Sequence, residues 1–271
     1  HTPYSMILHD YHLHSNFSCD CQATMAEMCR GAIAKGISEI GFTEHYDLHP
    51  NEGCRDWFKL DEWAAELEKC RAEFDGRLTI RAGIEIGEPH IFRAETRAML
   101  NRYPFDYVLG SLHWVGVETI FDPDYFRRRT QDEAFTAYFV ELECLTRIGE
   151  FDILSHFDVL IRAWGEMGGR YVPLEYEDAI RPVLRNCIAR GIALDINTKG
   201  LRSKINMLTP DIDILRWYAE MGGERVTLGS DSHQPHNVGA DLDKALSAAQ
   251  AAGIKWLTQF EGRESTLISI D

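Results

Sequence analysis

The stretch His9-Asp10-Tyr11-His12-Leu13-His14-Ser15 follows an apolar opening and is expected to form the first strand of the chain. Alternate side chains of a strand share a face, so His12 and His14 point the same way, with Asp10 beside them. Two imidazoles on one face can hold a metal ion, and a nearby carboxylate can orient one of the rings. A His-x-His pair also occurs in ordinary strands, so its interpretation as a metal site depends on the residues at the ends of the later strands.

Strand-like and helix-like runs alternate through the rest of the chain. Apolar residues recur with helical spacing at 25–35, 60–74, 91–100, 132–148, 176–190, 211–221 and 240–252. Strand-like runs lie between them at 39–45, 78–85, 107–113, 151–156, 192–197 and 225–231, and a strand, a turn and an edge strand are expected over 255–270. Thr209 is expected to cap the helix at 211–221.

Seven strand–helix units without a linker or a repeat predict one parallel α/β domain over residues 6–271, with residues 1–5 a remnant ahead of the native start. The expected fold is an α/β, distorted (β/α)7 TIM-like barrel, which is irregular or imperfectly closed because it is one unit short of the regular eight. A doubly wound open sheet is the structural alternative. Its nucleotide-binding version lacks support, since the sequence has neither a Gly-x-Gly-x-x-Gly motif after a strand nor a phosphate loop.

The composition, 45% hydrophobic and 26% charged residues, is typical of a globular protein. No apolar run approaches the roughly 20 residues of a membrane helix, and no leader peptide is visible, so we expect a cytoplasmic protein. The net charge of −15 argues against a nucleic-acid partner, but it permits a small phosphorylated substrate. The seven cysteines, an odd number, indicate reduced thiols, including Cys19 and Cys21 in one turn. The oligomeric state stays open.

Metal-binding side chains gather at or just past the carboxyl ends of the predicted strands. These ends meet at one face of a parallel barrel, where barrel active sites are built. The candidates are His12, His14, Asp20, His45, Glu85, His113, His156, Asp231 and His233. One zinc takes about four ligands, so nine suit two or three divalent ions, and Zn, Mn and Fe all accept imidazole and carboxylate. A single histidine at a strand end is usually structural, and Asp20 could instead cap a helix, but chance would not select the strand ends so consistently.

Six motifs carry a resemblance to a known family. They are Asp10-Tyr-His12-Leu-His14-Ser15, Phe42-Thr-Glu-His45, Gly83-Ile-Glu85, Gly110-Ser-Leu-His113, Ser155-His156 and Gly229-Ser-Asp231-Ser-His233. In this order they resemble the PHP family, named for polymerase and histidinol phosphatase domains. The resemblance implies a distorted (β/α)7 barrel with a trinuclear metal centre for phosphoester hydrolysis, the nine candidates as ligands and Glu85 as the bridging carboxylate. Glu44 departs from the pattern, because an aspartate is common before the motif histidine.

The domain size and the segment 196–202 are similar to those of stand-alone histidinol-phosphate phosphatases, so L-histidinol phosphate is the expected substrate. Two close metals can deliver a bridging hydroxide at neutral pH, while a third neutralises phosphate oxygens. The remaining phosphate oxygens need cations or hydrogen-bond donors. The candidates for that contact are Arg162, Asn197, Lys199 and Arg202. Asp47 or His49 could protonate the leaving alkoxide.

Three other functions stay open from the sequence. A phosphoesterase of the same chemistry could act on a nucleotide, a sugar phosphate or an oligonucleotide end. An amidohydrolase-type enzyme would usually need a metal-bridging lysine, and no predicted strand carries one. A barrel that binds a metal or a partner without turnover is disfavoured, since a degenerate site loses ligands that are present here.

Overall fold

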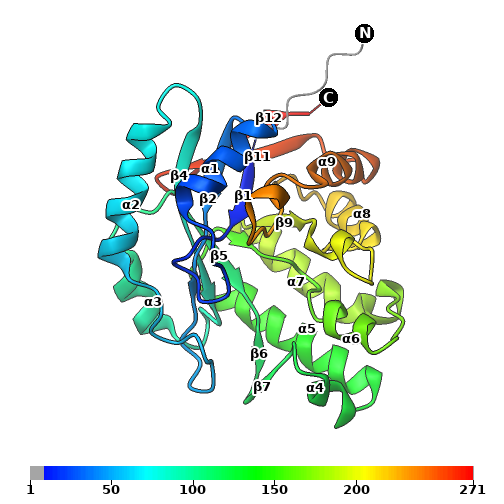
Figure 1. The fold of residues 1–271 in the computed structure, drawn as a ribbon. Coiled ribbons are helices and arrows are strands. Elements are labelled where there is room, and N and C mark those ends of the chain that lie inside the picture. The colour runs from blue at the N-terminus through cyan, green and yellow to red at the C-terminus, as the bar shows by residue number, and fades with distance from the viewer. Residues whose placement is uncertain (1–8, 271) are drawn as a thin grey trace.

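Seven parallel strands form the wall of a barrel in the computed structural model, which describes residues 9–270; the expectation for residues 1–5 lies outside this part. In spatial order they are β1 (Asp10–Leu13), β2 (Glu39–Phe42), β4 (Thr79–Gly87), β5 (Tyr107–Ser111), β8 (Ile153–Leu154), β9 (Ala193–Asn197) and β10 (Val226–Gly229) (Figure 1). The strand predicted over 39–45 is divided, because β3 (His45–Tyr46) is separate from β2 and pairs with β4. The predicted (β/α)7 barrel is confirmed.

The barrel is imperfectly closed between β1 and β10, as expected. Over residues 9–270, a single isolated bridge joins the two strands, in which His14 N donates to Ser232 O at 3.0 Å. The buried Asp10 carboxylate supports this seam, because it accepts hydrogen bonds from Ser230 N and Gly239 N, both at 2.8 Å. Asp10 therefore joins two strands, and the expectation that it orients a histidine ring is wrong.

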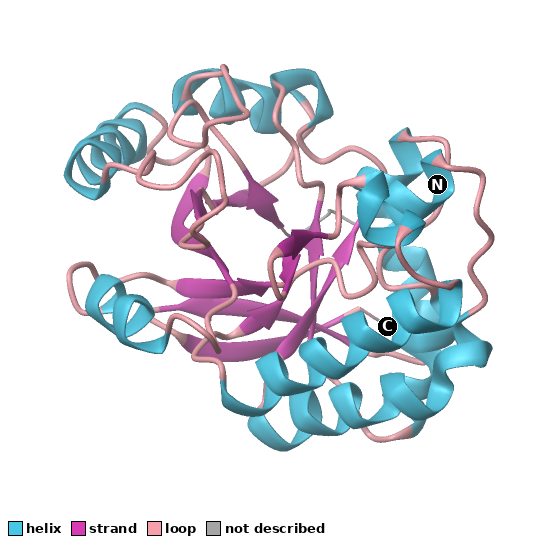
Figure 2. Cartoon of the chain, turned by 90° about the horizontal axis from the view of Figure 1, so that it is seen from below, coloured by secondary structure: helices cyan, strands magenta, loops and turns pink. Residues whose placement is uncertain are grey.

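Helices surround the strands on the outside of the barrel (Figure 2). The long ones are α1 (Met25–Ala34), α2 (Leu60–Glu73), α3 (Arg93–Leu100), α5 (Gln131–Ile148), α7 (Glu177–Arg190), α8 (Ile212–Glu220) and α9 (Leu242–Ala251). Their bounds agree with the predicted ones within two residues, because each buries an apolar stripe of helical period against the strands. Asp211 caps α8 through a 2.8 Å bond from Asp213 N, so the prediction of Thr209 as the cap is wrong.

Short elements that the periodicity did not predict lie after the carboxyl ends of the strands. They are β6 (Trp114–Val115), β7 (Glu118–Thr119), α4 (Pro123–Arg127), α6 (Ile161–Glu166), η1 (Pro173–Tyr176), η2 (Lys199–Arg202) and η3 (Pro235–Asn237). Elements of two to six residues are too short to show a period in the sequence. They matter because they carry the side chains around the mouth of the barrel.

A C-terminal hairpin closes the opposite end of the barrel. The strands β11 (Trp256–Glu261) and β12 (Glu264–Ser269) are antiparallel, as predicted, and Gly262 and Arg263 form the turn with φ of 54° and 67°. Phe260 packs inside the barrel beside Tyr107, and the Arg263 guanidinium bonds the Asp152 carboxylate at 2.9 and 3.0 Å. The open end of the barrel is therefore the carboxyl end of the strands.

One disulfide crosses this open end. It joins Cys19 in the loop after β1 to Cys54 in the loop after β3. The expectation of reduced thiols is therefore wrong for this pair, while Cys21 is free. The number of cysteines in a sequence does not reveal which loops meet in space, and this is why the prediction failed. Over residues 9–270, no helix is both long and apolar enough to cross a membrane.

Candidate metal centre

Glu85 lies at the centre of the open end, where β4 places its carboxylate among five imidazoles. The side chain is fully buried. Its Oε2 atom lies 3.3 Å from His12 Nε2, 3.5 Å from His14 Nε2 and 3.2 Å from His45 Nδ1. Its Oε1 atom lies 3.4 Å from His113 Nε2 and 3.2 Å from His156 Nε2. Because the two oxygens face different sets of histidines, this carboxylate is placed to bridge metal ions.

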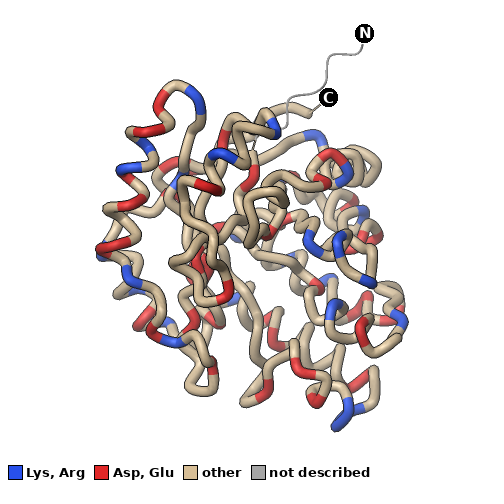
Figure 3. The backbone as a smooth tube through the Cα atoms, in the orientation of Figure 1, with Lys and Arg blue, Asp and Glu red and all other residues tan. Residues whose placement is uncertain are grey.

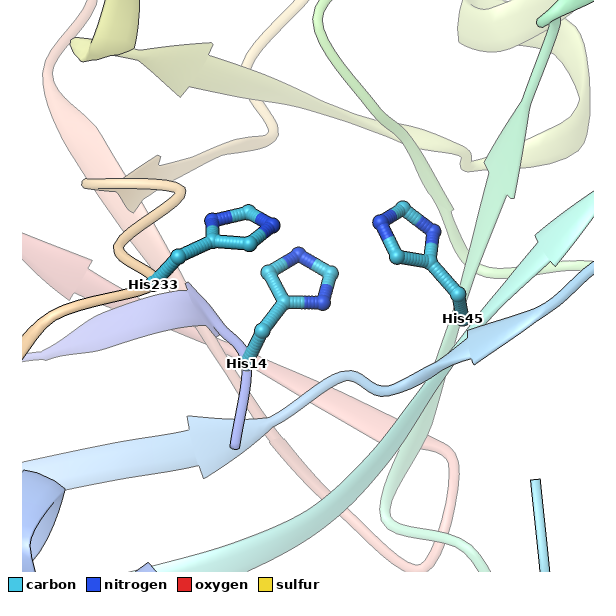
Figure 4. Close-up of side chains that lie close together, drawn as sticks. All are labelled: His14, His45 and His233. Carbon is cyan, nitrogen blue, oxygen red and sulfur yellow. The ribbon is translucent and has the colours of Figure 1, made fainter. Parts of the chain in front are cut away.

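Three histidines from different strands point toward one spot (Figure 4). His14 follows β1, His45 begins β3 and His233 follows β10, and the ring centroid of His14 lies 4.4 Å from that of His45 and 4.2 Å from that of His233. One nitrogen of each ring is buried and faces a carboxylate oxygen without hydrogen-bond geometry: His14 Nε2, His45 Nδ1 and His233 Nε2. Buried ring nitrogens without a hydrogen bond are available as metal ligands.

Asp231 joins a second group of ligands with His12 and His156, whose donor atoms all lie within 4.8 Å of one another. Its Oδ1 atom lies 3.9 Å from His12 Nε2 and 3.7 Å from His14 Nε2, so it also adjoins the first group. A third group consists of Glu85, His113 and His156. Two further groups, His12–His14–Glu85 and His45–Asp47–His113, bring the total over residues 9–270 to five overlapping groups, which suit the expected two or three metal ions.

Asp20 completes the nine predicted ligands from the loop after β1. Its Oδ2 atom lies 2.9 Å from His233 Nε2 and 3.7 Å from His45 Nε2. The alternative role as a helix cap is excluded, because Thr24 caps α1 and makes a capping box with Glu27. The structure therefore brings all nine predicted side chains to one place.

Two buried acids, Asp195 and Glu44, orient the histidines, and Asp195 is not among the residues predicted from the sequence. Asp195 on β9 has its Oδ2 atom 2.9 Å from His12 Nδ1, which fixes that ring. The period-two alternation of β9 places Asp195 on the same face as Asn197, and this was the available signal. Asn197 Nδ2 in turn donates to Asp195 Oδ2 at 3.1 Å.

Glu44, the departure from the family pattern, holds the loop after β1. Its buried carboxylate accepts hydrogen bonds from Ser15 N at 2.9 Å and from Ser18 Oγ at 2.6 Å. Ser18 Oγ also lies 3.1 Å from His14 Nδ1. Glu44 thus positions His14 through Ser18.

The two candidates for the general acid have different surroundings. Asp47 lies among the ligands, with Oδ1 3.3 Å from His113 Nδ1 and Oδ2 3.5 Å from His45 Nδ1. His49 lies outside the cavity lining, stacked on Trp114 at a centroid distance of 4.0 Å. Its Nε2 donates to Gly116 O at 3.0 Å and its Nδ1 accepts from Asn51 N at 3.2 Å. Since both nitrogens are engaged, the geometry does not support His49 as a proton donor.

Two of the predicted cations line the cavity beside Asp231. Arg162 on α6 donates to Asp231 Oδ2 at 3.1 Å and to Asn197 Oδ1 at 2.8 Å. Lys199 on η2 lies with its Nζ 2.9 Å from Asp231 Oδ1 and 3.3 Å from His233 Nδ1. Asn197 does not line the cavity and instead positions the Arg162 guanidinium.

Arg202 does not reach this cavity. Its guanidinium donates to Thr198 Oγ1 at 3.1 Å and to the carbonyl oxygen of Ser230. The bond to Ser230 directs the side chain toward the loop after β10. The geometry therefore gives Arg202 a role in holding these loops and does not support the expected phosphate contact.

The cavity at the open end of the barrel has a volume of about 370 Å³, within the range of small-molecule sites. Its lining consists of Cys19, Asp20, His45, Asp47, Glu52, Cys54, Glu85, His113, Phe121, His156, Arg162, Lys199 and Asp231. Figure 3 marks Asp and Glu positions (red) on the backbone near the centre of the molecule as well as along the outer helices. Metal ligands and cations thus share one pocket.

The charges in this cavity keep its central acids ionised. Burial alone would raise the pKa of Glu85, but the imidazoles of His45 and His12 hold that pKa well below its usual range. Burial likewise opposes the ionisation of Asp231, and Lys199 with His12 holds its pKa well below its usual range. Both side chains are therefore carboxylates at neutral pH, the form that binds metal.

Comparison with known proteins places this site in a family. The sequence model of the PHP domain matches residues 10–199. A Clostridium acetobutylicum protein named probable histidinol-phosphatase is 31% identical over 91% of this chain and 94% of its own. The Lactococcus lactis histidinol-phosphatase is 29% identical over 93% of this chain and 94% of its own.

A solved structure has the same fold. The crystal structure of histidinol phosphate phosphatase from Lactococcus lactis, complexed with Zn, L-histidinol and phosphate, superposes with a TM-score of 0.87 and 28% identity. The match covers 97% of this chain and all of that one. Since the domain match spans well over half of the residues, the chain belongs to the PHP domain family.

Proposed function

We propose that this protein is a metal-dependent phosphomonoesterase that hydrolyses L-histidinol phosphate to L-histidinol and phosphate. The observation that carries the proposal is the convergence of nine metal-binding side chains with Arg162 and Lys199 around one cavity. The similarity in sequence and fold to the Lactococcus lactis enzyme, whose crystal structure contains Zn, L-histidinol and phosphate, supports this substrate over other phosphomonoesters.

The side chains present fit a centre of two or three divalent metal ions. The ring nitrogens His14 Nε2, His45 Nδ1 and His233 Nε2 can each bind a metal ion once deprotonated, and Glu85 and Asp231 supply the negative charge. Imidazole together with carboxylate suits Zn, Mn and Fe alike. Metal ions held there supply Lewis acidity and an activated water for attack on phosphorus.

Arg162 and Lys199 would hold the phosphate oxygens that face away from the metal ligands. Arginine offers a planar fork that matches two phosphate oxygens, and Asn197 fixes the orientation of that fork. Lys199 is 39% exposed and contributes a compact charge at the edge of the cavity. Asp47, which lines the cavity, is then the group proposed to give a proton to the leaving alkoxide.

The proposal is tested by phosphate release from a panel of phosphomonoesters. Protein stripped of metal and reloaded with Zn or Mn is assayed with L-histidinol phosphate, a nucleoside monophosphate, a sugar phosphate and a phosphorylated oligonucleotide. We expect the highest kcat/KM for L-histidinol phosphate and more than one metal equivalent per chain. A higher kcat/KM for another compound would favour the corresponding phosphoesterase, and a metal-loaded protein without turnover would favour a binding function.

We propose further that the partner is a small molecule and that the protein works in the cytoplasm. The net charge of −15 would repel a nucleic-acid backbone. Five of the seven cysteines, Cys21, Cys29, Cys70, Cys144 and Cys187, stay free and agree with a reducing compartment, whereas the Cys19–Cys54 bond is the exception.

A further inference from the structure

Glu52 is an acid in the cavity that the metal centre does not use. It lies in the loop after β3 and lines the cavity beside Cys54. Its Oε1 accepts a hydrogen bond from Cys54 N at 3.2 Å and its Oε2 accepts one from Trp114 Nε1 at 3.1 Å. The other four acids of the lining each lie within 4 Å of a histidine, whereas Glu52 has no histidine or cation that close among residues 9–270.

A carboxylate in this position opposes the binding of a phosphate dianion, because like charges repel in a partly buried site. The cations of the lining do not offset it, since Arg162 and Lys199 are both paired with Asp231. Two N–H groups, of Cys54 and Trp114, are the neighbours of this carboxylate, and a ligand that brings a positive group would compensate its charge directly. The part of a phosphomonoester that can carry such a group is its leaving alcohol.

Apolar surface accompanies Glu52 in the cavity. Phe121 lines the cavity although it is 43% exposed, and its ring centroid lies 5.5 Å from that of His113. The Cys19–Cys54 disulfide lines the cavity as well. An exposed aromatic ring and a carboxylate that line one cavity suit an organic cation, which needs both a charge partner and contact for its carbon atoms.

We infer that Glu52, Phe121 and the Cys19–Cys54 disulfide form a subsite for a leaving group that carries an ammonium cation next to a flat or apolar body. This inference rests on the proposed function and deepens it, since L-histidinol is an amino alcohol with an imidazole ring. Glu52 selects the ammonium group, and Phe121 contacts the ring.

The charge is tested with two substrates that differ by one ammonium group, phosphoethanolamine and ethyl phosphate. We expect metal-loaded wild-type protein to have the higher kcat/KM for phosphoethanolamine. Glu52→Gln should remove this preference and lower kcat/KM for L-histidinol phosphate about ten- to a hundredfold, mainly through KM, because a hydrogen bond to a charged group is lost. Glu52→Asp, which keeps the carboxylate, should retain part of the preference for phosphoethanolamine. Glu62→Gln, the same change in charge at an exposed position of α2 outside the cavity, should leave all three values unchanged.

The ring contact is tested with Phe121→Ala, which should lower kcat/KM for L-histidinol phosphate and spare phosphoethanolamine, which has no ring. Metal content and Tm are measured for each variant, because Glu52 also accepts bonds from Trp114 and Cys54. If Glu52→Gln lowered kcat/KM equally for phosphoethanolamine and ethyl phosphate, or for neither, the subsite would be overturned while the phosphatase function stands. If wild-type protein preferred phosphoethanolamine through Glu52 but did not hydrolyse L-histidinol phosphate, the proposed substrate would be overturned and the subsite kept.

Discussion

Removal of the disulfide by Cys54→Ser should destabilise the open end of the barrel. The bond joins positions 35 residues apart and ties the loop that carries Asp20 to the loop that carries Glu52. Asp20 is 49% exposed and follows Cys19 in the chain. The disulfide therefore restricts the motion of this candidate metal ligand, which the surrounding protein covers only in part.

The size of the effect follows from the length of the closed loop. For 35 residues, the loss of chain entropy in the unfolded state amounts to about 4 kcal/mol at 25 °C. An unfolding entropy of about 2.1 cal/mol/K per residue then converts this value to a decrease in Tm of about 7 °C for a chain of 271 residues. Strain in the folded state would reduce the decrease, so 7 °C is an upper value.

The assay is calorimetric unfolding of metal-loaded protein with and without a dithiol reductant. Wild-type protein should lose several degrees in Tm when the reductant is added. Cys54→Ser should have this lowered Tm with and without the reductant. Cys144→Ser, at a free and half-buried cysteine, is the matched control and should respond to the reductant as wild type does. A wild-type Tm that does not change with the reductant would refute the tether.

Three other predictions concern the metal ligand, the phosphate contact and a buried acid. Glu85→Ala should lose metal and activity together, as measured by elemental analysis and phosphate release, whereas Glu95→Ala on the exposed side of α3 should keep both; full metal content in Glu85→Ala would contradict its bridging position. Arg162→Ala should lower kcat/KM about ten- to a hundredfold with unchanged metal content, and Arg162→Lys should recover only part of this loss. Wild-type kinetics in Arg162→Ala would show that Arg162 does not bind the phosphate. Burial raises the pKa of Asp158 to about 8 from 3.8, with the charge of Asp211 adding to the rise, so the folded state loses stability as pH rises between these values. Asp158→Asn should therefore gain Tm over wild type at pH 8 and much less at pH 5, and an equal gain at both would argue against ionisation of this group.

The convergence of the candidate metal ligands at the open end could be predicted from the sequence because strand geometry fixes the direction of the side chains. Alternate residues of a parallel strand face the same side, and all the strands of the barrel run the same way. Glu85 near the end of β4 and His113 just after β5 must therefore meet on one face, whatever the intervening helices do. The polarity of the strands carries this prediction, and no side-chain detail is needed.

The contacts of the loops could not be predicted in the same way. His49 and Arg202 lie in segments without a period, so the sequence does not fix the direction of their side chains. Each side chain bonds a carbonyl oxygen of a distant loop, which sets its direction. The Cys19–Cys54 bond and the bond from Asp195 to His12 are tertiary contacts between residues far apart in the chain. Local patterns carry no information on such pairs.

Asp231 connects the metal ligands with the phosphate contact. One of its oxygens lies 2.9 Å from Lys199 Nζ and the other 3.1 Å from an Arg162 nitrogen, while its Oδ1 is also 3.7 Å from His14 Nε2. If this carboxylate held a metal ion, its pairing with both cations would weaken, and the two cations would then be freer to meet phosphate oxygens. Under the proposed function, one aspartate would thus couple the metal ligands to the phosphate contact, and the coupling would require no movement of the barrel strands.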